Sequence, residues 1–348
     1  MPDTAAFAGT NIVIALNAVL AAIDADEPKV LCVRRPGGLL SLPYGPFDPV
    51  QHRTLEIGLR DWVTRQTHVP LGYVEQLYTF GDKGRETPAA AFADAPSDLR
   101  LVSVGYLALA SEPAVIEERE AQWRSFYDFF PWEDWRSGEP IVLRERIIHD
   151  LDAWIETASS KRDRLERERR RDLAFGLSQT GWEEERALER YELMYEAALV
   201  EEAWRDRKGA PNIEASGKRR QAQSVGAPMA SDHRRILATA ISRLRGKLKY
   251  RPIIFELMPD KFTLLGLQRA VEAIVGFDLH KQNFRRSVEA GGLVVKTRET
   301  AQQASGRPAA LFRAGEVALP DGGPRGLTIP RLRRSPGARS PGAGFSAD

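Results

Sequence analysis

Composition excludes several classes of protein before any motif is considered. The chain has 348 residues, of which 43% are hydrophobic and 28% charged, so it is long enough for two or more folded domains. Its single cysteine, Cys32, excludes a disulfide within the chain and indicates a reducing, cytoplasmic location. No apolar run reaches the roughly 18 residues that a membrane-spanning helix needs, so we expect no membrane contact.

Charge is divided unevenly along the chain. Residues 1–150 contain 14 Lys and Arg against 22 Asp and Glu, a net charge of −8. Residues 232–298 contain 14 against 6, a net charge of +8, and the total of +2 conceals this split. A basic segment joined to an acidic one predicts a polyanionic partner at one end of the protein.

The first 140 residues combine strand-like runs with one helix. Patterns typical of strands cover residues 12–23, 29–33, 39–42, 73–80 and 101–110. Between the third and fourth runs, an apolar stripe that includes Leu59 and Val63 predicts a helix over 55–67. This order indicates a mixed α/β sandwich, and the aromatic segment 131–135 is expected to pack beside it.

Residues 141–207 are predicted to be a helical insert. Apolar stripes predict helices over 141–157 and 182–207, and the stretch between them, 161–172, is almost entirely charged. Its mixed signs favour a solvated helix with i,i+4 ion pairs over a nucleic-acid patch. Two roles stay open for this helical hairpin, namely a dimer contact or packing on its own chain.

Two segments are too polar and too rich in small residues to predict a core. Gly, Pro, Ala, Ser, Lys and Gln dominate residues 208–230, which we interpret as a flexible linker. The tail, residues 316–348, has the same character with added arginines, and we expect it to be disordered.

Residues 231–315 begin with a predicted basic helix over 232–249. Its apolar face comprises Ile236, Leu237, Ala240, Ile241, Leu244 and Leu248. Its charged residues are expected to extend a basic surface; they are Arg234, Arg235, Arg243, Arg245, Lys247 and Lys249, followed by Arg251.

Two further helices and a hairpin follow. A helix after Thr263, with apolar residues at three-and-four spacing, ends at Gly276. Asp278 is predicted to cap a third helix over 279–290, and strand-like runs from 293 to 312 predict a β-hairpin. Helix, turn, basic helix and hairpin is the plan of a winged helix-turn-helix, whose second helix enters the major groove of DNA.

Cationic and amide side chains on the third helix and on the hairpin suit DNA recognition. The candidate DNA-binding residues are Lys281, Gln282, Asn283, Arg285, Arg286, Lys296 and Arg298. Arginine reads guanine bidentately, Asn and Gln read adenine, and Lys contacts phosphate. The alternative is that Arg285 and Arg286 only form a solvated helix face.

The segment PDKFTLLGLQRAVEAIVGFDLHKQNFRRSV, residues 259–288, resembles the C-terminal winged helix of the Nudix-related transcriptional regulators, bacterial repressors of NAD-metabolism genes. A second resemblance lies in LGYVEQLYTFGD, residues 71–82, with Arg85, a motif that borders the ligand cleft in that family. Together they imply an α+β multidomain chain with a Nudix-like α/β/α sandwich, a helical hairpin insert and a C-terminal winged helix-turn-helix.

The Nudix box itself is degenerate. Gly45 begins it, but Gln51 stands in the place of the first glutamate, and Thr64 and Arg65 take the places of the paired glutamates. Those carboxylates hold Mg²⁺ in the family, whereas Thr64 has no charge and Arg65 is a cation. We therefore expect no catalytic and no metal-binding residues.

The resemblance implies an NAD-derived effector, such as ADP-ribose or NAD itself, and no cofactor. A retained cleft would need aromatic rings for stacking and cations for phosphates. The candidate effector-binding residues are Arg34, Arg35, Phe47, Tyr78, Phe80 and Arg85. The alternative for each is an ordinary place on the surface or in the core.

These patterns favour a homodimeric, DNA-binding repressor of NAD biosynthesis or salvage genes that binds a double-stranded operator. One competing interpretation is a Nudix pyrophosphohydrolase that acts on ADP-ribose-like nucleotides through Glu56, Asp61 and Glu75. Another is an architectural DNA-binding protein without sequence preference, which steep salt dependence would reveal.

The first prediction concerns catalysis. Because the paired glutamates of the box are absent, purified protein supplied with Mg²⁺ should not hydrolyse ADP-ribose. Product formation is measured by chromatography after long incubation, with an active Nudix hydrolase as the positive control. Turnover that depends on Mg²⁺ would contradict the prediction.

Overall fold

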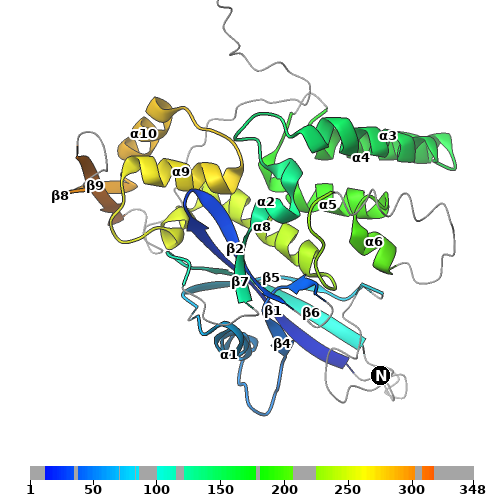
Figure 1. The fold of residues 1–348 in the computed structure, drawn as a ribbon, viewed down its shortest axis with the longest axis horizontal. Helices are drawn as coiled ribbons and strands as arrows, with labels where there is room; N and C mark the ends of the chain where they lie inside the picture. Colours follow the sequence, from blue (N-terminus) through cyan, green and yellow to red (C-terminus); the bar gives the residue numbers. More distant parts are fainter. Residues whose placement is uncertain are drawn as a thin grey trace, which may run out of the picture.

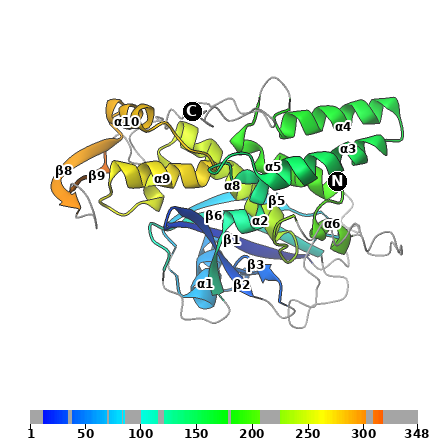
Figure 2. The same ribbon diagram turned by 45° about the horizontal axis from the view of Figure 1, so that its top comes forward.

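The computed structural model describes residues 12–34, 38–69, 71–82, 84–85, 100–114, 121–177, 181–206, 225–301 and 308–316. A β-sheet lies at the centre of this part of the chain, with helices on both of its faces (Figure 1). Figure 2, turned by 45°, again shows helix α1 (Leu55–Thr67) on one side of the sheet and α8 (His233–Tyr250) on the other. A small winged unit at one end contains β8 (Val294–Ala301) and β9 (Ala309–Ala314).

The central sheet is mixed, and its longest strand lies in the middle. Its order is β3-β2-β1-β6-β5, while β4 also pairs with β1 and β7 with β2. Only the β1–β6 pair is parallel among the described pairings. The strands are β1 Ile12–Asp24, β2 Glu27–Arg34, β3 Leu40–Ser41, β4 Tyr44–Pro46, β5 Tyr73–Phe80, β6 Arg100–Leu109 and β7 Ala121–Ser125.

The five predicted strands and the helix over 55–67 are confirmed. The sequence missed β4 and β7, which have three and five residues and therefore show almost no alternation. Side-chain alternation along β1 separates two apolar clusters: Leu16 and Ala18 face α1, whereas Val19 and Ala21 face the opposite helical layer. Both faces of the sheet are therefore buried.

The insert differs from the prediction in one respect. The expected helix over 182–207 is wrong as a single element, because it is broken between Ala197 and Val200, where Ala198 has a positive φ of 59°. Its elements are the 3-10 turn η5 Glu184–Arg186, α5 Ala187–Glu196 and α6 Glu201–Asp206. The preceding elements are a π-helical turn η4 Leu143–Ile148, α3 His149–Glu156 and α4 Lys161–Ala174.

Helix α4 is a solvated helix, as its mixed charges predicted. Arg164 pairs with Glu168 at 3.1 Å and Arg167 with Asp163 at 3.0 Å, both at i,i+4 spacing. The hairpin of α3 and α4 projects from the body of the molecule, while α5 packs on α8 (Figure 1). Packing of α5 on its own chain is thus observed.

The last residues of the predicted flexible linker pack against the body of the protein. Residues 207–224 lie outside the described part of the chain, but Val225 and Met229 are buried. Ala230 donates its N–H to the Leu40 carbonyl at 2.8 Å, and Met229 forms a β-bridge with Leu40. The chain therefore reaches α8 along the edge of the sheet, because Met229 fills an apolar site there.

Glu133 forms the centre of a buried ion-pair triad. It belongs to the 3-10 turn η3 (Pro131–Glu133), which follows α2 (Phe126–Phe129), and its carboxylate is fully buried. Arg190 of α5 donates to its Oε1 at 2.6 Å, and Arg245 of α8 donates to its Oε2. Burial would raise the pKa of Glu133, but the two guanidinium groups outweigh it and hold that pKa below its usual value.

The second prediction concerns this triad. Glu133→Gln keeps the shape of the side chain but leaves two buried arginines without their anion, so unfolding by urea should show a loss of about 3–5 kcal/mol. Glu196→Ala serves as the matched control, because Glu196 pairs with Arg170 on the surface. Solvent screening should keep that loss below about 1 kcal/mol. Equal losses in both variants would contradict the prediction.

Candidate nucleic-acid interface

The helix-turn-helix begins with α9 (Leu264–Val275). Thr263 caps it, because its hydroxyl accepts a hydrogen bond from the Gly266 N–H at 2.9 Å. Gly276 ends it in the left-handed conformation, with φ of 84°, as the sequence predicted. The predicted apolar face is buried; it comprises Leu264, Leu267, Ala270, Val271 and Ile274.

The turn that follows fixes the direction of the next helix, α10 (Lys281–Ala290). Glu272 Oε1 accepts hydrogen bonds from the Leu279 N–H at 2.7 Å and from Gln268 Nε2 at 2.8 Å, and Gln268 also donates to the Leu279 carbonyl. The predicted cap at Asp278 is wrong: His280 occupies the N-cap position without a side-chain bond, and Asp278 is exposed. The carboxylate that holds this turn comes from α9, four residues after Gln268.

Helix α10 has one buried and one exposed face. Phe284 and Val288 are buried, as predicted. The exposed face carries Lys281, Gln282, Arg285 and Arg286, with Asn283 half-buried beside them. Arg286 Nη2 donates a hydrogen bond to Asn283 Oδ1 at 3.0 Å.

The predicted hairpin is confirmed as β8 (Val294–Ala301) and β9 (Ala309–Ala314), which pair antiparallel. Phe312 of β9 exchanges two backbone hydrogen bonds with Phe262, at 2.8 and 2.9 Å, and this bridge fixes the hairpin to the start of α9. Lys296 and Arg298 of β8 are exposed. The candidate DNA-binding residues thus lie on α10 and on one adjoining strand, at one end of the molecule (Figure 1).

The expected basic surface on α8 is wrong. Its helix and its apolar face are as predicted, but most of its cations are turned into the protein and paired with carboxylates. The pairs are Arg234–Glu202 at 3.2 Å, Lys247–Glu75 at 2.6 Å, Lys249–Glu184 at 2.8 Å, Arg245–Glu133 and Arg235–Asp82. Because α8 lies between the sheet and the insert, its charges join those two parts; Arg243 and Arg251 remain exposed.

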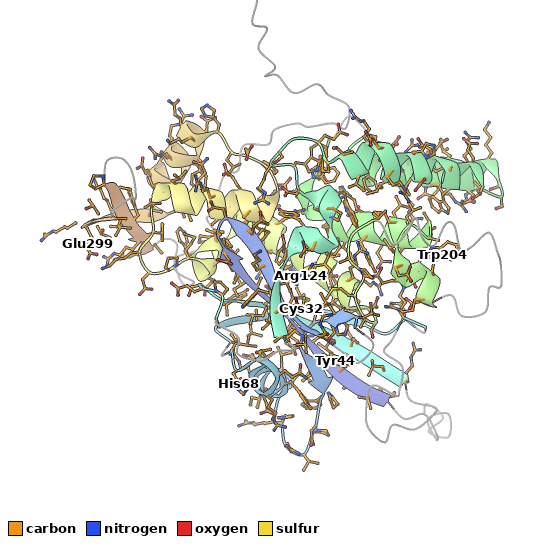
Figure 3. All side chains as sticks on the ribbon, in the orientation of Figure 1. Cys32, Tyr44, His68, Arg124, Trp204 and Glu299 are labelled. Carbon is orange, nitrogen blue, oxygen red and sulfur yellow. The ribbon has the colours of Figure 1, made fainter. Side chains whose placement is uncertain are left out.

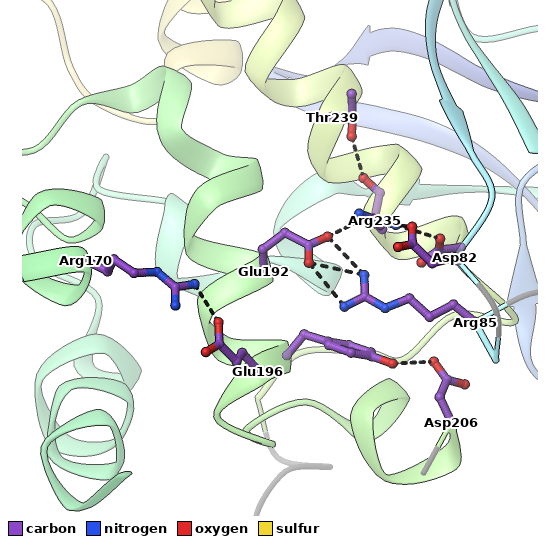
Figure 4. A network of polar contacts seen from close by, with 10 residues as sticks. Asp82, Arg85, Arg170, Glu192, Glu196, Asp206, Arg235 and Thr239 are labelled. Atoms are coloured by element: carbon purple, nitrogen blue, oxygen red, sulfur yellow. Dashed lines mark hydrogen bonds and ion pairs between the residues drawn. The ribbon is translucent and has the colours of Figure 1, made fainter. Parts of the chain in front are cut away.

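Arg85, a candidate effector-binding residue, also joins the N-terminal domain to the insert. Its guanidinium binds both carboxylate oxygens of Glu192 at 3.1 Å and lies 3.5 Å from the ring centre of Tyr195. Figure 4 shows that Arg235 binds the same Glu192 carboxylate and also reaches Asp82. Nearby, burial raises the pKa of Asp232 to about 6 despite the two arginines. In this structure Arg85 therefore contacts the insert and not an open cleft.

The other candidate effector residues do not gather at one place. Phe47 packs with the apolar cluster between α1 and the sheet, whereas Phe80 is buried in the cluster on the opposite side, under Arg235. Arg34 is exposed and donates to the Gly38 carbonyl, and Arg35 lies outside the described residues.

Tyr78 lines a groove of about 330 Å³ on the α8 side of the sheet. The side chains around it come from β5, from the insert and from α8. They are Tyr78, Glu185, Leu188, Glu189, Thr239, Ser242, Arg243, Gly246, Lys247 and Tyr250. This groove lies across the sheet from α1, so it is separate from the position of the degenerate box.

The carboxylates near that box are engaged within the protein. On α1, Glu56 pairs with Arg60 at 2.8 Å and Asp61 pairs with Arg65 at 2.8 Å. Glu75 aligns with Leu107 on the other face of the sheet, where Lys247 binds it, so it cannot join the two α1 carboxylates. No group of three or more His, Cys, Asp or Glu side chains among the described residues is arranged to hold a metal ion.

Gly45, which begins the box, has a packing role. A Cβ at this position would lie 2.1 Å from the ring of Trp62, so β4 can rest on α1 only with glycine there. Trp62 Nε1 also donates to the Pro46 carbonyl at 2.7 Å.

Figure 3 shows how densely side chains fill the body of the molecule around Cys32. Cys32 is fully buried, and burial raises the pKa of its thiol to about 12.

Residues that position this interface were missed by the sequence analysis. Glu272 and Gln268 fix the turn before α10, and their four-residue separation on a predicted helix was the available signal. Glu133 and Glu192 left no local signal, because their partners are distant along the chain.

None of the helices in the described residues is both long and apolar enough to cross a membrane.

Comparison with known proteins gives one family match and one curated relative. The NrtR DNA-binding winged helix domain matches residues 254–314. The ADPR responsive transcriptional repressor NtrR of Acinetobacter baylyi is 37% identical over 109 residues, which are 31% of this chain and 43% of that protein. The chain thus matches less than half of that relative's length.

Solved structures resemble the chain over most of its length. Shewanella oneidensis NrtR in complex with a 27mer DNA has a TM-score of 0.51 and 21% identity, and covers 88% of this chain and 94% of its own. The structure of the same protein without DNA also has a TM-score of 0.51, at 20% identity. That match covers 90% of this chain and 97% of the Shewanella protein. At this identity the likeness establishes the fold. Residues 254–314 therefore match the winged-helix domain of the NrtR type, and the described part of the chain has the fold seen in Shewanella oneidensis NrtR.

Proposed function

We propose that this protein is a DNA-binding transcriptional repressor that senses an NAD-related metabolite through its degenerate Nudix domain. The observation that carries the proposal is the exposed cationic face of α10, with Arg285 and Arg286, in a winged-helix domain that matches a DNA-binding family. Recognition helices of this kind place their exposed side chains in the major groove. Genes of NAD biosynthesis or salvage are the proposed targets, since the Nudix-related regulators that the sequence resembles repress NAD-metabolism genes.

The N-terminal domain is proposed to act as a sensor and not as an enzyme. The box positions Thr64 and Arg65 supply no metal ligand, and the carboxylates of the alternative set lie on opposite faces of the sheet. ADP-ribose is the effector that we favour, and NAD is the second choice, because the matched repressor is described as ADPR responsive. Effector contacts by the candidate residues on the α1 side, Phe47 above all, are part of this proposal.

Coupling between the domains has a physical route in the proposed repressor. Asp26, in the turn between β1 and β2, pairs with Arg269 of α9 at 3.0 Å. Close by, the Tyr127 hydroxyl donates to the Ala273 carbonyl, and the Trp135 N–H donates to the Gly276 carbonyl at 2.6 Å. In a proposed homodimer, a tilt of the sheet at these contacts would change the separation of two recognition helices, and two half-sites demand a fixed separation.

The third prediction tests DNA binding. The full-length protein should bind a promoter of NAD biosynthesis or salvage genes far more tightly than random DNA at physiological salt, as measured by fluorescence anisotropy. Lys281→Ala should weaken binding about five- to tenfold for every sequence and reduce the salt slope by about 0.9, which corresponds to one lost phosphate contact.

Lys249→Ala is the matched control, because Lys249 pairs with Glu184 and Glu185 inside the protein and should leave DNA affinity unchanged. Steep salt dependence without any sequence preference would support the architectural alternative instead. Weak binding to all duplexes would contradict the proposal and direct attention to hydrolysis.

The fourth prediction locates the effector. ADP-ribose, NAD and ATP are titrated against the protein–promoter complex, and ADP-ribose should change the affinity for DNA most. Phe47→Ala should weaken the response to ADP-ribose about tenfold, since stacking on an aromatic ring contributes about 1–3 kcal/mol. Tyr78→Ala, on the other face of the sheet, should leave the response unchanged. If Tyr78→Ala weakens the response and Phe47→Ala does not, the effector binds in the groove beside α8.

A further inference from the structure

Helix α10 carries two adjacent exposed arginines with different surroundings. Arg286 Nη2 donates a hydrogen bond to Asn283 Oδ1 at 3.0 Å, one turn back along the helix. The guanidinium of Arg285 has no hydrogen bond or ion pair with any residue that the structure describes. One guanidinium is therefore held in place before DNA arrives, and the other is not.

This difference matters for base recognition. A guanidinium has five N–H donors, so after one bond to Asn283 it keeps enough of them for the two bonds that guanine O6 and N7 accept. A long side chain that is already ordered loses less freedom when it binds. Arg286 thus has the organisation that bidentate reading of guanine requires, whereas an unconstrained arginine suits the less directional phosphate contact.

The same bond changes the expected role of Asn283. An asparagine that reads adenine uses its Oδ1 as acceptor and its Nδ2 as donor together. Here one lone pair of Oδ1 already accepts a hydrogen bond from Arg286, which directs the amide along the helix, and the residue is half-buried at the third position of α10. N-terminal positions of a recognition helix are those that approach base edges, so a small amide there is well placed to orient its longer neighbour.

We propose that Asn283 is a positioning residue that holds Arg286 for bidentate reading of one guanine, while Arg285 contacts the phosphate backbone. This inference rests on the proposed function and adds a division of labour within α10. Sequence preference at one G·C pair then depends on the Asn283–Arg286 pair, and Arg285 contributes affinity without preference.

The experiment starts from an operator selected out of random duplexes by the full-length protein. Binding constants are then measured for that operator and for each of its single base-pair substitutions. Arg286→Ala should abolish discrimination at one G·C pair, a loss of about 10- to 100-fold. Asn283→Ala should reduce discrimination at the same pair about three- to tenfold, and the double variant should discriminate no worse than Arg286→Ala alone.

Two further variants separate orientation from direct reading. Asn283→Asp keeps the acceptor oxygen and removes the amide donor, so discrimination at the guanine should persist even though the added charge weakens binding to all sequences. Arg285→Ala should weaken binding uniformly and lower the salt slope by about 0.9. Each variant is checked for an unchanged circular dichroism spectrum.

Several results would overturn the inference. If Asn283→Ala changes preference at an A·T pair, Asn283 reads a base itself. If it leaves all preferences unchanged, or if Arg285→Ala is the variant that loses guanine discrimination, the assigned roles are wrong. A wild-type protein that selects no sequence contradicts the proposed function as well, and that outcome is visible before any variant is made.

Discussion

A carboxylate removed from water is stable only with cations and donors around it, and Glu133 has two arginines. Arg190 brings the insert to it, and Arg245 brings α8. Arg245 also donates to the Ile274 carbonyl, at the end of α9, at 2.8 Å. One buried anion therefore joins the segment after the sheet, the insert, the long helix α8 and the winged helix. Neither the insert nor α8 could move away from Glu133 without leaving a charge unpaired in the core, and the winged helix would lose its hydrogen bond from Arg245.

That constraint explains why charge along the sequence was a poor guide to α8. Composition counts Arg234, Arg245 and Lys249 in the same way as Arg285 and Arg286, and all belong to a segment of net charge +8. In the folded chain the first three meet Glu202, Glu133 and Glu184, which belong to the acidic part of the protein and to the insert. The uneven charge therefore has two purposes, since part of it holds the domains together and part remains on the surface at α10 and β8.

Local patterns predicted local elements well. The bounds of α1 and β5 match because periodicity and end signals lie within each segment, and Thr263 and Gly276 marked the ends of α9 for the same reason. What failed depends mainly on distant partners, as in the pairing of β7 with β2 and the partner of Glu133. The break at Ala198 is a local left-handed residue that no glycine marked. The candidate effector residues do not gather at one place because the choice of sheet face is a tertiary property. Phe47 and Phe80 look alike in sequence, yet they lie on opposite sides of the sheet.

The magnitudes of these contacts limit how a signal could pass from the sheet to the winged helix. Coupling free energies between two binding sites are typically about 1–3 kcal/mol, whereas breaking a buried ion pair costs about 3–5 kcal/mol. A ligand cannot separate Glu133 from its arginines within that range, so in the proposed sensor the triad would stay closed with and without effector. The Asp26–Arg269 pair is half exposed, and such pairs contribute about 0–1 kcal/mol. A change in orientation that opens this pair and pivots about the triad is therefore within the reach of an effector, and it would act on α9, to which the turn before α10 is fixed through Glu272.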